Sequence, residues 1–375
     1  MVKTATMSVE EAFRLAAGLA AQGDHDQASG ILRQLHAHAP DDVGIMRALG
    51  VTLVNSGDLD GALPFMQMAA QRECSARNVV DFVKLLRELR RIPDIVHVCD
   101  VAWPHIGDDP ELLGIWAYAC LQMAQLEKSL NLLDRALAIV PDSFELWHNR
   151  SAALVQMGRG EEAVSSFRHL ARPWDGQERG RDLVAEYAAL APSYDDNSLH
   201  GSFTRRLLEH VERAQPGREF SSILELGCGS GMLAGNLKTR TERLVGIDLS
   251  PDMLRKAEAT GRYQALHLGD LVAVLEGLEE SFAAVLAASV LYFLPDLKPI
   301  FAQVSRCLAP GGIFAFSVDP TADDMDIGVV REGEYCHSRR YLRGVAASYG
   351  FSEVLIEIDN HRGAAGFFCT FAKPA

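Results

Sequence analysis

The sequence lacks the features that mark secreted, membrane-spanning and metal-binding chains. No run reaches the roughly 18 consecutive apolar residues of a membrane helix. The start, MVKTATMSVEEAF, has no apolar core followed by small residues, so we expect no secretory signal. The seven cysteines are scattered, odd in number and without a C-x-x-C pair, and the histidines of the first half show no metal-ligand spacing. We therefore expect a reduced, cytoplasmic chain with no metal site.

Positive charge is also scarce. The chain has 36 lysines and arginines against 50 aspartates and glutamates, which gives a formal net charge of −14 at pH 7. A field of this sign repels phosphates, so we expect no general binding to nucleic acid or to an anionic membrane. Hydrophobic content of 48% and charged content of 23% are normal for a globular protein, and 375 residues suggest about two domains.

The first half of the chain repeats itself. Residues 9–172 are rich in alanine and leucine with helical periodicity, and equivalent positions such as Gly23 and Gly57, or Ala124 and Gly158, lie 34 residues apart. This pattern resembles the tetratricopeptide repeat, with units starting near residues 9, 43, 77, 110 and 144. The third unit is degenerate, because Lys84 and Arg87 occupy positions that are usually apolar or small. Its place in the chain is therefore set mainly by the spacing of its neighbours.

A single helical hairpin cannot bury its apolar face, so repeated units stack into a curved solenoid with a concave groove. The resemblance implies that this groove binds a protein or peptide, or a second copy of the chain as a homodimer. A spacer or dimerisation arm is the alternative. Proline, glycine and charge around residues 171–180 indicate a linker. We expect a repeat domain over 1–172, a linker with two helices over 173–220 and a second domain over 221–375.

After residue 220 strands alternate with helices. The expected strands cover residues 222–226, 243–248, 263–268, 283–288, 312–318, 354–358 and 366–371, and helical patterns separate the first five. This alternation predicts a doubly wound, mainly parallel α/β sheet of seven strands, with an antiparallel hairpin at one edge. Ligands of such sheets bind beyond the carboxyl ends of the strands. The fold class is thus an α-helical solenoid followed by an α/β doubly wound, Rossmann-like domain.

The stretch I-L-E-L-G-C-G-S-G over residues 223–231 ends a strand in three alternating glycines. It is not a dinucleotide fingerprint, because Met232 stands where the third glycine belongs, and no lysine follows to make a triphosphate loop. With its acid two residues before the first glycine, it resembles the nucleoside-binding loop of class I S-adenosylmethionine-dependent methyltransferases. The loop residues that this resemblance assigns to the cofactor are Glu225, Gly227, Cys228, Gly229 and Gly231.

Further motifs follow in the order expected of that family. The resemblance implies that Asp248 accepts from the ribose hydroxyls, that an aspartate after the third strand accepts from the adenine amino group, and that Leu249 and Met253 flank the adenine. That third-strand aspartate is Asp270, followed by Leu271; Ser289 stands where the family often has an acid after the fourth strand. Both aspartates also admit a simpler interpretation as helix caps.

The expected reaction is methyl transfer from S-adenosylmethionine, which leaves S-adenosylhomocysteine. The protein aligns donor and acceptor, and a base is needed only when the acceptor arrives protonated. The candidate catalytic residues are Tyr194, which resembles a residue that closes over the cofactor, Tyr292 as a substrate contact, and His337 as a general base. Two of them have simpler interpretations: Tyr292 as a packing aromatic and His337 as a surface histidine at the start of a helix. Acidic residues 319–326 are expected to form a lid or a solvated loop.

The leading hypothesis is a methyltransferase whose repeats recruit a protein or peptide substrate. The chain as a whole resembles a bacterial group that joins tetratricopeptide repeats to such a methyltransferase domain, which implies architecture more than substrate. One alternative is a small-molecule methyltransferase of the natural-product type, with repeats that dock a carrier protein or form a dimer. Another is a non-catalytic scaffold that binds S-adenosylmethionine.

Overall fold

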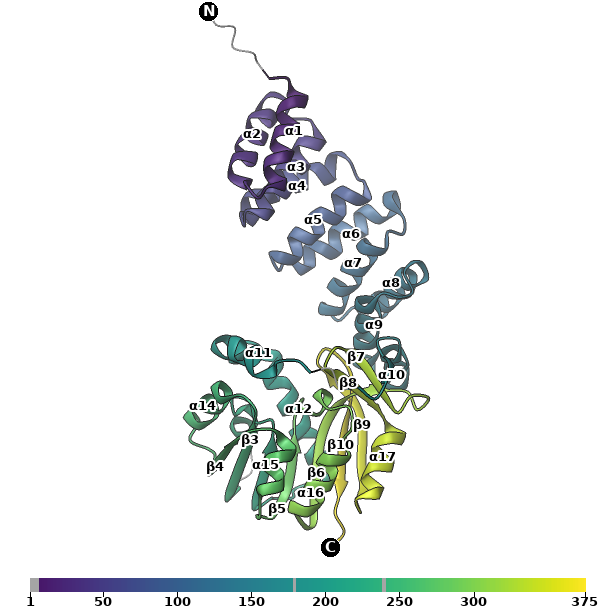
Figure 1. The fold of residues 1–375 in the computed structure, drawn as a ribbon. Helices are drawn as coiled ribbons and strands as arrows, with labels where there is room; N and C mark the ends of the chain where they lie inside the picture. The colour runs from purple at the N-terminus through teal and green to yellow at the C-terminus, as the bar shows by residue number, and fades with distance from the viewer. Residues whose placement is uncertain (1–6, 178–179, 238–240) are drawn as a thin grey trace, which may run out of the picture. The chain divides into compact units, whose positions relative to one another are not determined.

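The computed structural model describes residues 7–177, 180–237 and 241–375 (Figure 1). The chain divides into two compact units, residues 1–146 and 147–375. The first consists of helical hairpins, and the second is built on a mixed sheet flanked by helices (Figure 1). The predicted fold class, helical repeats followed by a doubly wound α/β domain, is confirmed. No helix among the described residues is long and apolar enough to cross a membrane.

Eight helices of the first unit form four hairpins in its described part. They are α1 (Val9–Ala21) with α2 (His25–His38), α3 (Val43–Asn55) with α4 (Leu59–Arg72), α5 (Ala76–Glu88) with α6 (Ile92–Ile106), and α7 (Pro110–Gln122) with α8 (Leu126–Ile139). A repeated glycine–aspartate pair sets the first two turns. Gly23 and Gly57 both have a φ of 85° directly after the first helix, a left-handed conformation that glycine adopts without strain. Asp24 and Asp58 follow as N-caps, and each carboxylate accepts a backbone N–H from the second helix.

The third hairpin is as regular as its neighbours, although its sequence departs from the repeat. Arg90, with a φ of 56°, takes the left-handed position that glycine holds in the first two hairpins. Lys84 of α5 forms an ion pair with Glu111 of α7 at 2.5 Å, so its charge lies at the surface and does not disturb the core. The helix α5 begins at residue 76, one residue before the predicted start. The repeat is therefore preserved in structure where its sequence signal fails.

The fifth hairpin, α9 (Phe144–Gln156) and α10 (Gly160–Arg168), packs against the sheet of the second unit. The backbone N–H of Ala365 in the sheet donates to Ser151 Oγ at 3.1 Å. A Cβ on Gly160 would lie 3.0 Å from Ile358 Cδ1, so a larger residue here would require Ile358 to shift. The division between the compact units accordingly falls at residue 146, earlier than the boundary at 172 inferred from the sequence.

Ten strands make up the sheet of the described chain. They are β1 (Arg172–Pro173), β2 (Ser222–Leu226), β3 (Arg243–Asp248), β4 (Ala265–Leu268), β5 (Phe282–Ala287), β6 (Leu308–Thr321), β7 (Ile327–Arg331), β8 (Glu334–Ser338), β9 (Ser352–His361) and β10 (Ala364–Ala372). Strands β4, β3, β2, β5 and β6 are parallel neighbours in that order, β10 is antiparallel to β6, and β9 pairs with β10. The C-terminal hairpin expected from the sequence is thus present, with β9 at its edge.

Helices surround this sheet and cover its ends. They are α11 (Leu183–Leu190), the 3₁₀ helix η1 (Ala191–Asp196), α12 (Ser198–Ala214), α13 (Met232–Asn236), α14 (Pro251–Ala259), α15 (Leu271–Gly277), the 3₁₀ helix η2 (Leu291–Phe293), α16 (Lys298–Cys307) and α17 (Arg339–Ser348). Leu207 and Val211 of α12 pack in one core cluster with Ile223 of β2 and Ala284 of β5. This places α12 beside β2, the strand that leads into the glycine loop.

Part of the sheet was not expected from the sequence. Beyond Val318, β6 leaves β10 and pairs with β8, which continues through β7 to β1. The acidic tract 319–326 therefore begins inside a strand, with Asp319 only 2% exposed and Thr321 only 1% exposed. Its interpretation as a lid or a solvated loop is wrong for these residues, because hydrogen bonding to β8 continues the strand where the local sequence suggests a turn.

Candidate functional site

A pocket of about 1040 Å³ opens where β2, β3, β4 and β5 end. Its lining includes ten of the eleven residues predicted to bind the cofactor: Glu225, Gly227, Cys228, Gly229, Asp248, Leu249, Met253, Asp270, Leu271 and Ser289. Residues from α11, η1 and α12, among them Tyr187, Tyr194 and Phe203, line it as well. The motifs that the sequence analysis singled out thus come together at the edge of the sheet where doubly wound folds bind ligands.

The three glycines of the loop have different neighbours. A Cβ on Gly227 would lie 2.6 Å from Val290 Cγ2, and one on Gly231 would lie 3.1 Å from Thr260 Cγ2 after α14. Close packing therefore explains why glycine occupies positions 227 and 231. Gly231 does not line the pocket. A Cβ on Gly229 would meet nothing within 4 Å. Gly229 is the glycine whose bare backbone lies beside open space.

Asp248 ties the end of β3 to this loop. Its Oδ2 accepts the Gly229 N–H at 2.7 Å, and its Oδ1 accepts the Ser250 N–H at 2.8 Å. The backbone hydrogen bonds lower the pKa of the Asp248 carboxyl, but burial raises it by more, so the pKa lies above its ordinary value. The cap of α14 is Ser250, whose Oγ accepts the Met253 N–H at 3.3 Å, so the alternative of Asp248 as that cap is wrong.

Asp270, by contrast, does cap a helix. Its Oδ1 accepts the N–H groups of Val272 and Ala273 at 3.0 Å at the start of α15. The residue also lines the pocket. The capping interpretation and a ligand role are therefore compatible, because the two bonds both use Oδ1 and the carboxylate has a second oxygen.

Glu225 lies at the bottom of the pocket. Its side chain is 3% exposed, and its Oε2 accepts the Tyr263 hydroxyl at 2.6 Å. Burial raises the pKa of this carboxyl to about 8, more than the Tyr263 bond lowers it. Cys228 is buried as well, and burial raises the pKa of its thiol, which keeps it protonated.

Tyr194 belongs to a segment that is fastened over the pocket. The neighbouring Asp195 accepts the Ser230 hydroxyl at 2.6 Å and pairs with Lys256 at 2.8 Å. His200 stacks on the Tyr194 ring with centroids 3.9 Å apart, and its Nδ1 lies 2.9 Å from the Tyr194 carbonyl oxygen. These contacts hold η1 against both the glycine loop and α14, and so place Tyr194 in the pocket wall.

The other two candidate catalytic residues do not line the pocket. His337 is fully buried at the end of β8, where its Nε2 lies 3.0 Å from the Pro295 carbonyl oxygen, and burial lowers its pKa to about 4. The interpretation as a surface histidine is wrong, because His337 is buried within β8 and the helix begins only after Ser338. Tyr292 is 6% exposed and packs under the Arg362 guanidinium at 3.8 Å, as a packing aromatic does.

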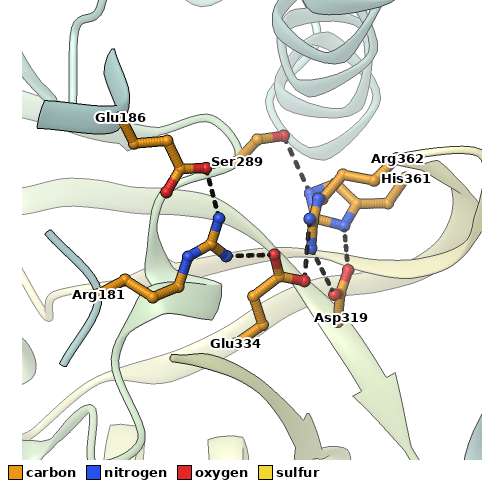
Figure 2. A network of polar contacts seen from close by, with 7 residues as sticks. All are labelled: Arg181, Glu186, Ser289, Asp319, Glu334, His361 and Arg362. Atoms are coloured by element: carbon orange, nitrogen blue, oxygen red, sulfur yellow. Dashed lines mark hydrogen bonds and ion pairs between the residues drawn. The ribbon is translucent and has the colours of Figure 1, made fainter. Parts of the chain in front are cut away.

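Sequence reasoning missed a buried polar network behind the pocket (Figure 2). It joins Ser289, His361, Asp319, Arg362 and Glu334, and continues to the surface through Arg181. Only Ser289 of this set was expected at the site. Among the described residues, no group of three or more histidines, cysteines or carboxylates is arranged to hold a metal ion.

Comparisons with known proteins agree with this architecture. A family model described as a methyltransferase domain matches residues 224–316, and one described as a tetratricopeptide repeat matches residues 19–73. The first begins inside β2 and ends inside β6, so it covers the glycine loop and both pocket aspartates. The chain therefore carries both a tetratricopeptide-repeat match and a methyltransferase-domain match.

Three relatives each match less than half of the chain. An uncharacterised methyltransferase of Schizosaccharomyces pombe is 32% identical over 127 residues, 32% of this chain and 49% of that protein. The mitochondrial ubiquinone biosynthesis O-methyltransferase of Homo sapiens is 27% identical over 44% of this chain and 46% of its own length. The malonyl-[acyl-carrier protein] O-methyltransferase of Salmonella typhimurium is 25% identical over 36% of this chain and 52% of its own length. The chain thus spans about half the length of these curated relatives.

Proposed function

We propose that the chain is an S-adenosylmethionine-dependent methyltransferase. The observation that carries the proposal is the pocket that is lined by the bare backbone of Gly229, by Asp248, which is bonded to it, and by the buried Glu225. A match of residues 224–316 to a methyltransferase domain supports it.

The pocket residues fit the parts of the cofactor. Asp248 has lone pairs left to accept ribose hydroxyls after its two backbone bonds, and Gly229 lets the ligand approach the main chain. The Leu249 side chain is 40% exposed at the pocket, which leaves an apolar surface for the adenine ring. Glu225 is suited to the ammonium of the amino-acid end, and Asp270 Oδ2 to the adenine amino group. The bound cofactor supplies the methyl group and its leaving group, while these residues orient it and Tyr194 excludes water.

Calorimetry with S-adenosylmethionine and S-adenosylhomocysteine tests this proposal directly. Both ligands are expected to bind with a stoichiometry of about one per chain. A valine at Gly229 would fill the open space beside the backbone, so Gly229→Val should bind neither ligand. Gly217→Val is the control, because Gly217 also has a positive φ and open space beside it but does not line the pocket. Absence of binding to the wild-type chain contradicts both the enzyme and the scaffold hypotheses.

For the repeats, we infer recruitment of a protein or peptide substrate. The support is the stack of hairpins α1 to α8, with a hollow between the second and third hairpins that is lined by charged residues of both signs. Lysate incubated with methyl-labelled cofactor and full-length protein should then show label in a protein band. Label in small molecules instead favours the second candidate, a small-molecule methyltransferase whose repeats dock a carrier or form a dimer. The relatives named for ubiquinone biosynthesis and for malonyl-acyl carrier protein favour that candidate.

The third hypothesis, a scaffold that binds the cofactor without catalysis, requires binding by calorimetry and no label in either fraction. We also propose a cytoplasmic location, which the cysteines support. All seven are free thiols, and six of them are buried in the structure. Fractionation of the source cells tests that assignment.

A further inference from the structure

Ser289, His361 and Asp319 form a continuous hydrogen-bonded chain that starts in the pocket. Ser289 Oγ lies 2.9 Å from His361 Nε2, and His361 Nδ1 lies 2.8 Å from Asp319 Oδ1 (Figure 2). Ser289 lines the pocket, whereas His361 and Asp319 are only 1% and 2% exposed. The serine is thus the one member of the chain that a ligand can reach.

The sheet topology brings these residues together. Ser289 follows β5, Asp319 lies near the end of β6, and His361 is the last residue of β9. The strand β6 is parallel to β5, and β9 runs in the same direction because β10 reverses between them. All three residues therefore lie at the carboxyl edge of the sheet, where the cofactor pocket also opens.

Charge around the histidine fixes the direction of the hydrogen bonds. Burial alone would raise the pKa of the Asp319 carboxyl, but the Arg362 guanidinium and the His361 bond outweigh burial and hold this pKa below its usual value. An ionised Asp319 can only accept, so Nδ1 of His361 carries a hydrogen and Nε2 is the acceptor. The hydroxyl of Ser289 then donates to Nε2. Its oxygen keeps lone pairs that face the pocket.

The charges of the network leave room for one more proton. Arg362 donates to Asp319 Oδ2 at 2.9 Å and to Glu334 Oε2 at 3.1 Å, and Arg181 bonds the other Glu334 oxygen at 2.5 Å. Arg181 also pairs with Glu186. These five groups carry three negative and two positive charges, so an imidazolium at His361 makes the whole network neutral. Further titratable groups near this cluster are Tyr292, His148, Cys336 and His337.

The backbone holds Ser289 in an unusual conformation. Its φ is 53°, in the left-handed region that residues with a side chain rarely adopt. The Ser317 hydroxyl oxygen accepts its N–H at 3.0 Å and keeps it there. Strained residues of this kind concentrate at functional sites, where the surrounding structure fixes them.

The chain contains a second hydroxyl–imidazole–carboxylate set that serves as an internal comparison. Thr370 Oγ1 lies 3.0 Å from His210 Nε2, and His210 Nδ1 lies 2.5 Å from Glu357 Oε2. Thr370 is completely buried and does not line the pocket. The arrangement by itself is therefore compatible with a purely structural role, and it is the exposure of Ser289 to the pocket that distinguishes the first set.

We propose that Ser289 is a catalytic residue that takes the proton of the methyl acceptor and relays it to His361, with Asp319 as the positioning residue of the imidazole. This inference rests on the proposed methyltransferase function. As the acceptor oxygen or nitrogen bonds to the methyl carbon, the electron pair of the breaking carbon–sulfur bond stays on sulfur. The acceptor proton passes to Ser289 Oγ, and the hydroxyl proton of Ser289 passes to His361 Nε2.

The relay also defines a substrate class. A carboxylate acceptor arrives without a proton and needs no base, whereas an alcohol, a phenol or a protonated amine must lose one. We therefore assign to this pocket an acceptor with an O–H or N–H group, and not a carboxylate.

Covalent labelling of Ser289 tests the relay without knowledge of the acceptor. A serine hydroxyl that donates to an imidazole attacks the phosphorus of diisopropyl fluorophosphate, fluoride leaves, and the hydroxyl proton passes to His361. Peptide mass spectrometry of the full-length chain should find Ser289 modified well before the exposed Ser56 and Ser348. Excess S-adenosylhomocysteine should slow the labelling, because Ser289 lines the same pocket.

Variants separate activation from structure. His361→Asn and Asp319→Asn should each lower the labelling rate of Ser289 at least tenfold, while His210→Asn, in the buried comparison set, should keep the wild-type rate. If either variant fails to fold, the order of labelling among serines in the wild-type chain still decides. The relay is overturned if the wild-type chain binds S-adenosylhomocysteine but labels Ser289 no faster than Ser56. If calorimetry shows no cofactor binding while Ser289 is labelled, the proposed function fails and the activated serine stands.

Discussion

Gly229 donates its backbone N–H to Asp248 Oδ2 at 2.7 Å, which joins the glycine loop after β2 to the end of β3. One carboxylate thus fixes the loop and still presents lone pairs to the pocket. Motifs that lie 19 residues apart in the sequence act as one structural element. The loop therefore depends on Asp248 for its shape, and the proposed cofactor depends on both.

We predict that Asp248→Ala weakens S-adenosylhomocysteine binding by about 10- to 100-fold, because a hydrogen bond to a charged group contributes about 1.5–3 kcal/mol. The matched control is Asp252→Ala on α14, a carboxylate that pairs with Arg255 and does not line the pocket. Calorimetry of both variants at one pH and salt concentration checks this. If Asp248→Ala binds S-adenosylhomocysteine as tightly as the wild-type chain, the proposal that Asp248 accepts from the ribose hydroxyls is wrong.

We also predict that cofactor binding releases a proton from Glu225. Burial raises the pKa of this carboxyl to about 8, so it is mostly protonated at pH 7 in the empty pocket. An ammonium group beside it favours the ionised form and lowers the pKa. Binding at pH 7 should then release up to about one proton, and the release should disappear as the pH rises above about 8. Calorimetry in buffers of different ionisation enthalpy measures the number released.

The control for this measurement is Glu225→Gln, which cannot release the proton and keeps a partner for the Tyr263 hydroxyl. Its binding enthalpy should not depend on the buffer. The same variant should unfold at a higher denaturant concentration than the wild-type chain at pH 9, and the difference should shrink toward pH 5. The sign follows from the raised pKa, since the protonated carboxyl stabilises the folded chain at low pH and this stability is lost as the pH rises through about 8. Buffer-dependent binding by Glu225→Gln would contradict the assignment.

Local patterns in the sequence were sufficient for most of the fold. The 34-residue spacing of Gly23 and Gly57 reports a turn that each hairpin makes with its own residues, so the repeat is visible without the structure. The strands β2 and β3 were predicted with their exact bounds, because buried parallel strands are continuous apolar runs. The strand β8 was missed, since it is defined by pairing with the end of β6 and its own sequence is polar.

The site divides in the same way. The glycine loop and Asp248 carry a local motif, and they were found. His361 lies 72 residues from Ser289 and 42 from Asp319, so no spacing in the sequence joins them. Their meeting depends on the order and direction of β5, β6, β10 and β9, which is a property of the whole sheet. His337 was predicted as a base because the ordinary pKa of an imidazole lies near neutral pH, but its side chain is buried in β8.

The position of the fifth hairpin predicts the effect of truncation. Removal of residues 1–142 should leave cofactor affinity unchanged, whereas removal of residues 1–172 should abolish it or leave the chain insoluble. The longer deletion takes away α10, which packs on β6 and β10, and the Ser151 hydroxyl that accepts the Ala365 N–H. Each large apolar side chain that becomes exposed to water lowers the free energy of unfolding by about 1.5–3 kcal/mol. Thermal unfolding with and without S-adenosylhomocysteine measures both effects, and equal behaviour of the two truncations would show that the hairpin is dispensable.

Arg362 should be the residue on which the buried network depends most. Its guanidinium is the partner of both Asp319 and Glu334, which are 3% and 8% exposed at their side chains. Arg362→Ala leaves two buried carboxylates with reduced compensation, and we predict a loss of about 3–5 kcal/mol in the free energy of unfolding. Arg243→Ala, which breaks the half-exposed pair with Glu280, should cost at most about 1 kcal/mol. Urea unfolding of the two variants measures the difference. Adding Asp319→Asn to Arg362→Ala should recover part of the loss, because one uncompensated charge is then gone, and additive losses in the double variant would contradict this origin.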